Sequence, residues 1–239
     1  MKRLWQNKFE NLDLVRTSPL YYRGAAVKKD NLNCFFFYAW LGITEISFDI
    51  NNGQILAFGK NGDVKAYQES YGSKHDPYHF ERDDFVFGDY IISHSGEWGY
   101  ACHKNNQLLW KKSFRGYLYT DMIWNQGNIV FGTSGQGGHF YCVNIDTGET
   151  VFDFNTKGTS KFFDINGNYY FCVADRKSTQ LLKIDYSGNV LENIEVEGTY
   201  YDGECLFDLC DDLLCVMTLK KSKKENLERF NPILHCVQV

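Results

Sequence analysis

Two histidines four residues apart come nearest to a metal site in this sequence. His75 and His79 lie beside Asp76 and Glu81, and on a helix two histidines at this spacing would share one face and could bind a metal ion. Pro77 lies between them, and a proline at that position argues against a helix. We therefore expect no metal site in this chain.

Acidic residues occur in close pairs that could supply a catalytic acid and base, as in sugar hydrolases. The pairs are Asp83 with Asp84, Asp211 with Asp212, and Asp202 with Glu204. Carboxylates in turns are usually hydrated, and no serine stands in a G-x-S-x-G motif. We expect no catalytic residues and no cofactor.

The eight cysteines are predicted to be buried thiols. Cys210 and Cys215 lie five residues apart with no companion pair, which does not match the ligand spacing of a zinc site. The glycine-rich segment Gly132–Gly138 lacks the Lys-Ser/Thr of a phosphate loop and lies between two predicted strands. We interpret it as a hairpin.

The charge balance excludes broad binding to nucleic acid or to anionic membranes. The 239 residues carry a net charge of −5, which repels phosphate and suits a basic protein partner. The N-terminal segment is basic but lacks the apolar run of a signal peptide, and no stretch approaches the roughly 18 apolar residues of a membrane span. We expect a cytoplasmic protein.

An internal repeat determines the predicted fold. Its clearest copy, Thr120–Phe154, contains four short apolar segments, with turns at Asn125-Gln126-Gly127 and Asp146-Thr147-Gly148. Such turn residues tolerate the positive φ angles of tight hairpins. Because 17% of the residues are aromatic, the composition also favours strands. Each copy is predicted to be one four-stranded blade of a propeller.

Further copies precede and follow this one. They span Asp84–Phe114, Lys161–Val196, a looser copy in Leu20–Phe58 with strands at Cys34–Trp40, Thr44–Asp49 and Gln54–Phe58, and a fifth copy from Cys205 with strands at Leu213–Leu219 and Ile233–Val239. The sequence therefore predicts a single all-β domain over residues 1–239, a small propeller of about five blades.

The fifth copy lacks its fourth strand, and the N-terminus is predicted to supply it. The segment Leu4–Phe9 resembles Leu109–Phe114, the outer strand of the second copy, with both aromatic residues in register. Pairing the N-terminal strand with the last blade would remove an exposed sheet edge. An unrelated basic N-terminal strand is the alternative.

The segments Gly127–Thr133 and Phe140–Phe152 resemble the repeat of quinoprotein-like (PQQ-like) propellers. In that repeat a glycine-ended strand, a strand with tyrosine and aspartate, a Thr-Gly turn and a terminal tryptophan recur. Phe152 and Ala57 occupy positions where tryptophan is usual, and about five blades are fewer than the quinone-dependent enzymes have. The resemblance implies the fold and does not imply a quinone.

Two segments are longer than the repeat requires, and long loops in a compact domain are often functional. They are Gly59–Arg82, which mixes aromatic and acidic residues, and the lysine-rich Lys220–Pro232. The first is the better candidate for recognition. The predicted partner-binding residues are Tyr71, Asp76, Tyr78, Phe80, Glu81, Asp83, Asp84, Glu97, Trp98, Tyr201, Asp202 and Glu204.

The leading functional hypothesis is a non-enzymatic protein-binding module, an immunity protein that neutralises a cognate bacterial toxin such as a basic nuclease. Small size, negative charge and the missing targeting signal support it. One alternative is an enzyme of hydrolase or lactonase type with its site in the central channel. Another is an assembly scaffold similar to outer-membrane assembly propellers, which the missing export signal disfavours.

Overall fold

The structure is a computed structural model of the 239-residue chain. It describes residues 1–8, 14–15, 23–29, 32–39, 42–49, 51–60, 84–96, 98–134, 138–158, 161–174, 178–199, 206–210, 212–224 and 227–239. Within these ranges all regular secondary structure is β-strand. No helix in the described part of the chain is long and apolar enough to cross a membrane.

The described residues form twenty-two strands, which follow one another along the chain. They are β1 Lys2–Lys8, β2 Leu14–Val15, β3 Arg23–Lys29, β4 Leu32–Ala39, β5 Gly42–Phe48, β6 Ile55–Lys60, β7 Phe85–Phe87, β8 Tyr90–His94, β9 Gly99–Lys104, β10 Gln107–Ser113, β11 Tyr117–Leu118, β12 Ile123–Asn125, β13 Asn128–Ser134, β14 His139–Asn144, β15 Thr150–Asn155, β16 Phe162–Ile165, β17 Asn168–Ala174, β18 Ser178–Ile184, β19 Val190–Glu197, β20 Leu206–Cys210, β21 Leu213–Lys224 and β22 Leu227–Gln238.

The described strands form five antiparallel sheets whose strand order follows the chain. The orders are β3-β4-β5-β6, β7-β8-β9-β10, β12-β13-β14-β15 with β11 also on β13, β16-β17-β18-β19, and β20-β21-β22-β1 with β2 also on β22. In the last sheet the N-terminal strand pairs with the C-terminal one, from Lys2 opposite Gln238 to Lys8 opposite Ile233. This pairing is the one that the sequence predicts.

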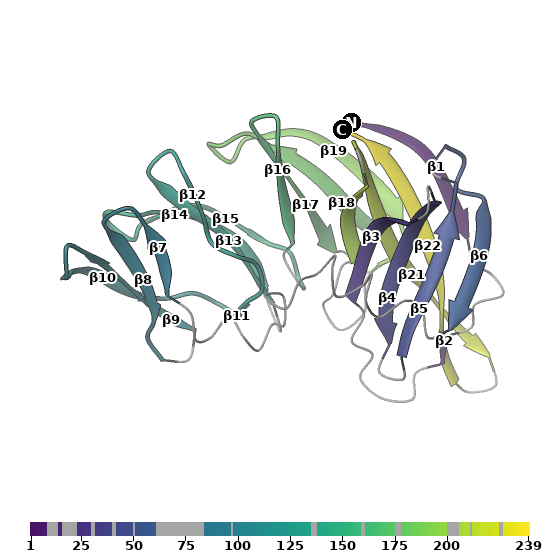
Figure 1. The fold of residues 1–239 in the computed structure, drawn as a ribbon, viewed down its shortest axis with the longest axis horizontal. Helices are drawn as coiled ribbons and strands as arrows, with labels where there is room; N and C mark the ends of the chain where they lie inside the picture. The colour runs from purple at the N-terminus through teal and green to yellow at the C-terminus, as the bar shows by residue number, and fades with distance from the viewer. Residues whose placement is uncertain are drawn as a thin grey trace.

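The sheets lie side by side along an arc (Figure 1). The β7–β10 sheet stands at one end and the β3–β6 sheet at the other, with the chain termini together at one edge of the last sheet. The sheets that are first and second in the sequence are therefore at opposite ends of the arc. Their connection, residues 61–83, lies outside the described residues.

Two sequence-based expectations are wrong in detail. The segment Lys220–Pro232 is not a long loop, because β21 and β22 continue as paired strands to Lys224 and Leu227. The extension pairs polar residues such as Lys223 and Glu228. It lacks the alternation of apolar and polar residues that would have indicated a strand in the sequence. The looser first copy also has an additional inner strand, β3, whose small and basic residues gave no strand signal.

A β-bulge recurs in the outermost strand of every sheet. In each case one residue is skipped in the register with the neighbouring strand. The skipped residues are Leu4, Leu56, Leu109, Val151 and Leu191, all of them partly exposed. Bulges increase local twist and interrupt an edge that could otherwise pair with another chain. The bulge also sets the position of the side chain that follows it.

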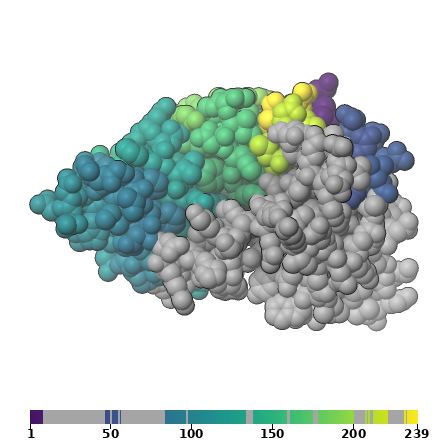
Figure 2. Space-filling view, viewed as in Figure 1, coloured from purple at the N-terminus to yellow at the C-terminus, as the bar shows by residue number. Residues whose placement is uncertain are grey.

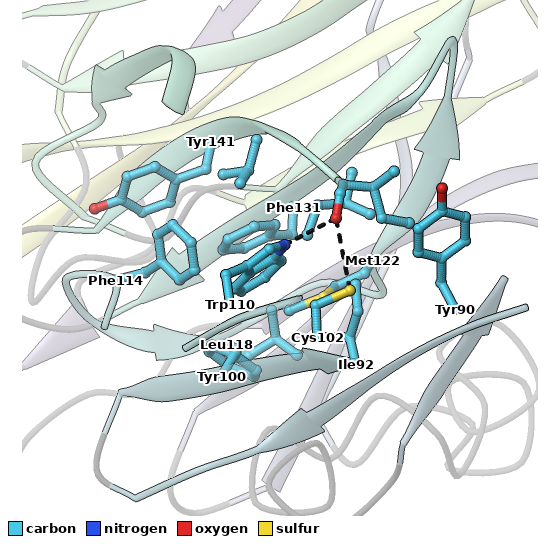
Figure 3. Packing of buried hydrophobic residues seen from close by; sticks show 13 residues of the cluster. Tyr90, Ile92, Tyr100, Cys102, Trp110, Phe114, Leu118, Met122, Phe131 and Tyr141 are labelled. Atoms are coloured by element: carbon cyan, nitrogen blue, oxygen red, sulfur yellow. Dashed lines mark hydrogen bonds between the residues drawn. The ribbon is translucent and has the colours of Figure 1, made fainter. Parts of the chain in front are cut away.

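The residue after the bulge connects one sheet to the next. Trp110 of β10 is buried and its Nε1 donates a hydrogen bond of 2.8 Å to the Ile145 carbonyl of the next sheet, as Figure 3 shows. Its ring lies on Gly148, where an added Cβ would be 2.7 Å from the ring and where φ is +71°. Only glycine fits both this close approach and this backbone conformation. We call this arrangement the docking contact.

The docking contact occurs at two further junctions. Phe152 of β15 lies against Gly188 of the following sheet, with 2.7 Å to a Cβ placed there, and Trp5 of β1 lies against Gly53 of the β3–β6 sheet. Trp5 also makes an edge-to-face contact of 5.7 Å with Phe48. The N-terminal strand therefore completes the last sheet and joins it to the first.

Opposite charges connect the β16–β19 sheet to the last sheet. The residue after the bulge in β19 is Glu192, which forms a salt bridge with the N-terminal amine of Met1. Farther along β19, the Glu197 carboxylate accepts hydrogen bonds from Lys8 Nζ at 2.7 Å and from Lys220 Nζ at 2.9 Å. These hydrogen bonds lower the pKa of the Glu197 carboxyl to about 2. The acidic β19 and the basic β1 are thus complementary.

His235 lies buried at the same junction. Its Nε2 is 2.9 Å from Thr218 Oγ1 and 3.0 Å from the Glu197 carbonyl oxygen. Desolvation, together with the nearby Arg3 and Lys8, lowers the pKa of His235 to about 4. The imidazole is therefore neutral at neutral pH and accepts no proton until the solution is strongly acidic.

This burial predicts a specific loss of stability in mild acid. Unfolding returns the His235 pKa from about 4 to its ordinary value of 6.5, so the unfolded state gains a proton below pH 6.5 that the folded state does not bind. Stability then falls as the pH drops from 6.5 towards 4, by about 2 kcal/mol at pH 5. Urea unfolding at pH 7.5 and pH 5 measures this difference.

The matched variant is His235→Gln, which cannot titrate. Between pH 7.5 and pH 5, the free energy of unfolding of the wild type is expected to fall by about 2 kcal/mol more than that of His235→Gln. Glu197 does not interfere, because its contribution is complete above pH 4.5 and is lost only as the pH falls towards 2. Identical pH dependence in both proteins would show that His235 is not buried as described.

Candidate binding surface

The sheet topology separates the connections into two ends. Because successive strands alternate in direction, the turns after the first and third strands of each sheet lie at one end and the other connections at the opposite end. The first group, which we call the turn end, includes 49–54, 88–89, 105–106, 126–127, 145–149, 166–167 and 185–189. The second group, the loop end, includes 95–96, 98, 114–122, 156–158, 161 and 198–199.

Of the twelve predicted partner-binding residues the structure describes two, and both lie at the loop end. Asp84 and Trp98 are described, and both are exposed. The other ten lie outside the described residues, so their prediction is untested: Tyr71, Asp76, Tyr78, Phe80, Glu81, Asp83, Glu97, Tyr201, Asp202 and Glu204. His75 and His79 lie outside them as well.

Trp98 is held in an unusual backbone conformation at the surface. Its φ is +58°, in the left-handed region that non-glycine residues rarely adopt and that costs about 1–3 kcal/mol. Its carbonyl accepts a hydrogen bond of 2.8 Å from the Phe114 amide, which fixes the turn before β9. The indole is 38% exposed. A large aromatic side chain is therefore presented to solvent from a strained and fixed position.

Tyr117 lies beside Trp98 and enlarges the exposed aromatic surface. The two rings meet edge to face with 5.9 Å between centroids, and Tyr117 is 46% exposed. The neighbouring Arg115 is also exposed, and its amide donates to Tyr141 Oη at 3.1 Å. We call Trp98 and Tyr117 the aromatic pair. It combines an apolar surface with a nearby cation, a composition typical of interface hot spots.

An oriented histidine lies close to this region. His139 Nδ1 is 2.8 Å from Asp153 Oδ2, and the imidazole stacks on Tyr141 with 5.2 Å between centroids. A catalytic dyad of this type requires a nucleophile at Nε2. Among the described residues no hydrogen-bond partner lies at His139 Nε2.

The turn end carries a polar bridge between two sheets. Tyr90 Oη donates to Asp146 Oδ1 at 2.6 Å, and Lys104 Nζ donates to Tyr90 Oη at 2.6 Å. The Tyr90 hydrogen bond and Lys104 lower the pKa of Asp146, and the same contacts raise the pKa of Lys104. These charges stabilise the junction next to the Trp110 docking contact.

Acidic residues are concentrated at the turn end. Its described turns contain no lysine or arginine, and their acids are Asp49, Asp89, Asp146, Glu149, Asp185 and Asp212. Several of them cap their own turns, as Asp185 does by accepting the Ser187 and Asn189 amides at 2.9 Å. The turn end is therefore a negatively charged surface.

The cysteines whose side chains the structure describes are buried and free, as predicted: Cys102, Cys142, Cys172, Cys215 and Cys236. Burial raises the pKa of Cys102 to about 11 and that of Cys142 to about 12, which disfavours the reactive thiolate. The described residues contain no group of three or more His, Cys, Asp or Glu that could hold a metal ion. The Gly132–Gly138 segment joins β13 to β14, which pair as a hairpin.

Sequence reasoning missed Tyr117 and Arg115 at the loop end. They fall in the connection between two predicted blades, where no hydrophobic period marks a surface residue. Their one signal is Gly116 between them, because a glycine beside an aromatic residue often marks a turn. The Tyr90, Lys104 and Asp146 bridge was also missed, since these residues belong to different strands or turns.

Comparisons with known proteins identify no family. No protein-family model matches the sequence, and no curated protein matches it either. Solved structures with a similar strand arrangement include BamB from Moraxella catarrhalis, at 11% identity and a TM-score of 0.41, over 95% of this chain and 61% of that one. The chain thus spans about three fifths of the BamB chain.

Two further similar structures are WD40 domains. The WD40 β-propeller domain of Doa1 shares 11% identity at a TM-score of 0.39, over 86% of this chain and 62% of that one. The Pan2 WD40 domain of Neurospora crassa shares 11% identity at a TM-score of 0.33, over 97% of this chain and 67% of that one. These similarities concern strand arrangement alone.

The strain at Trp98 predicts that its replacement stabilises the protein. Trp98→Asn places a residue that tolerates positive φ in the same turn, and we expect the free energy of unfolding to rise by about 1 kcal/mol. Urea unfolding measures this change. The matched control is Trp124→Asn, which removes a tryptophan that is 50% exposed from β12 and its contacts with Phe87 and Tyr90, and it should destabilise. A loss of stability in Trp98→Asn would mean that the indole is structural.

Proposed function

We propose that this protein is a non-enzymatic binding scaffold that neutralises another protein in the cytoplasm, an immunity protein that occludes a cognate bacterial toxin. The five sheets are the blades of a small closed propeller in this proposal. The rigid sheets position loops and turns for recognition and perform no chemistry of their own.

The aromatic pair at the loop end is the observation that carries the proposal. Trp98 is kept exposed in a conformation that costs free energy, and strain of this kind is found where function requires it. Tryptophan, tyrosine and arginine are the residues that contribute most to binding energy in protein interfaces. Trp98 and Tyr117 supply two of these types in contact with each other, and the exposed Arg115 lies two residues before Tyr117 in the chain.

The charge distribution supports a basic partner. The net charge is −5, and a net negative charge attracts cations at a distance. A basic toxin such as a nuclease would be drawn to the molecule by this charge and then held by apolar contacts, because charge mainly raises the association rate. In this proposal the bound protein covers the toxin's active site and so blocks its activity.

Co-expression with the product of the neighbouring gene tests the proposal, because toxin and inhibitor genes are commonly adjacent. We expect a stable complex and protection of cells from that product. In the purified complex, Trp98→Asn should weaken binding about tenfold or more, as expected of an interface hot spot, although the variant protein is fully folded. Titration calorimetry measures the affinity.

The control is Val190→Ala, which shortens a side chain that is 51% exposed on the outer strand of another sheet. This variant should leave the affinity unchanged within about twofold, because Val190 belongs to β19, a strand of a different sheet from the aromatic pair. Failure of the neighbouring product to bind or be neutralised would reject the immunity role. Equal affinity of Trp98→Asn and wild type would reject the binding surface.

A further inference from the structure

Four of the five positions between consecutive blades carry a contact at the residue after the bulge. Three are docking contacts of an aromatic ring with a glycine, and at the fourth Glu192 binds the N-terminal amine. The remaining position is the one between the β3–β6 sheet and the β7–β10 sheet. We call it the seam.

Both halves of the docking contact are missing at the seam. The residue after the bulge in β6 is Ala57, which lies opposite Ser47 as Trp110 lies opposite Cys102. The turn that would receive it is Asn105-Asn106, a two-residue turn without glycine whose residues have φ of 49° and 63°. No large ring and no glycine are available to form the contact.

The face of the β7–β10 sheet that points to the seam is also different. In this sheet Tyr90, Ile92, Tyr100 and Cys102 pack towards β12–β15, so the alternating residues face the other way. These are Ile91 opposite His103 and Ser93 opposite Ala101. At the matching register positions, the β12–β15 sheet has Ile129 opposite Val143 and Phe131 opposite Tyr141. The seam face is thus smaller and more polar.

The middle of the seam face is less buried than its counterparts. Val86, Ile91, His103 and Leu108 form one row across the four strands. The ends of the row, Val86 and Leu108, are exposed, as are the residues at the matching positions of the next sheet. Ile91 and His103 in its middle are half-buried, whereas Ile129 and Val143 at the matching positions are fully buried. In Figure 2 the residues of β7–β10 form one end of the molecule.

We propose that the seam is the junction at which this propeller opens and closes. In solution the β3–β6 and β7–β10 sheets meet there and cover the row from Val86 to Leu108, but without a docking contact they separate more easily than the other sheets. This inference rests on the proposed ring and not on the proposed partner.

The N-terminal strand is not the weak point of the ring. A strand that joins the two chain ends is the obvious place for a ring to open, because no covalent link holds it there. Here Trp5 docks on Gly53, Lys8 and Gln6 bind Glu197, and β1 pairs with β22 along its length. At the docking position of the seam, Ala57 offers no ring and the Asn105-Asn106 turn offers no glycine.

Installing the missing contact tests the proposal. Ala57→Trp supplies the ring, and Asn106→Gly supplies the glycine in a turn where Asn-Gly is favourable. If the two positions meet, the double variant should unfold at a temperature about 3 °C or more above the value expected from adding the two single changes. If the change in unfolding temperature of the double variant equals the sum of the two single changes, the proposal is overturned.

Small-angle scattering of the same proteins tests the opening. The double variant should have a radius of gyration of about 18 Å, as expected of a compact domain of this length, and the wild type a larger one. Equal radii in both would show that the seam does not open. If the tryptophan variant fails to fold, Ala57→Phe with Asn106→Gly replaces it, since Phe152 makes the same contact at another junction.

Discussion

An aromatic ring from the outer strand of one sheet, packed on the glycine of the next sheet's turn, is the contact on which the arrangement of sheets depends. Each sheet packs one apolar face against each neighbouring sheet. Apolar contact alone does not specify how two sheets are rotated or shifted relative to each other. The docking contact fixes both, because Trp110 is hydrogen-bonded to Ile145 and also fills the space above Gly148. The bulge before the ring aims it at the neighbouring sheet.

The N-terminal strand matters because it brings a docking residue to a sheet that would otherwise lack one. Trp5 performs for the last sheet what Trp110 performs for the second. The charges of β1 and β19 then select this pairing, since Lys8 meets Glu197 and Met1 meets Glu192. Lys8 and the N-terminal amine are therefore each paired with an acidic residue of β19.

The repeat and the N-terminal pairing could be predicted from the sequence because both depend on local patterns. Tight-turn residues recur, and Leu4-Trp5 matches Leu109-Trp110. An aliphatic residue precedes each docking position, and in the structure this residue is the one skipped at the bulge. The bulge could not be predicted, because alternation within a strand does not reveal a skipped residue. Contacts between sheets, such as Tyr90 with Asp146, depend on register across sheets and have no signal in one sequence.

The candidate surface was predicted only in part. Trp98 was among the predicted partner-binding residues, and the structure adds its positive φ and its contact with Tyr117. Neither feature can be inferred from composition, because a tryptophan in a left-handed conformation runs against its own preference. The absent docking pair at Ala57 and Asn106 was visible in part, since Ala57 departs from the tryptophan of the related repeat.

Urea unfolding of Trp110→Ala beside Leu109→Ala tests the role of the docking contact most directly. Trp110 is 8% exposed and packs against Gly148, whereas Leu109 is 39% exposed and is the skipped residue of the bulge. The docking account predicts a loss of about 3–5 kcal/mol for Trp110→Ala and less than about 1 kcal/mol for Leu109→Ala. Equal losses for the two variants would contradict it.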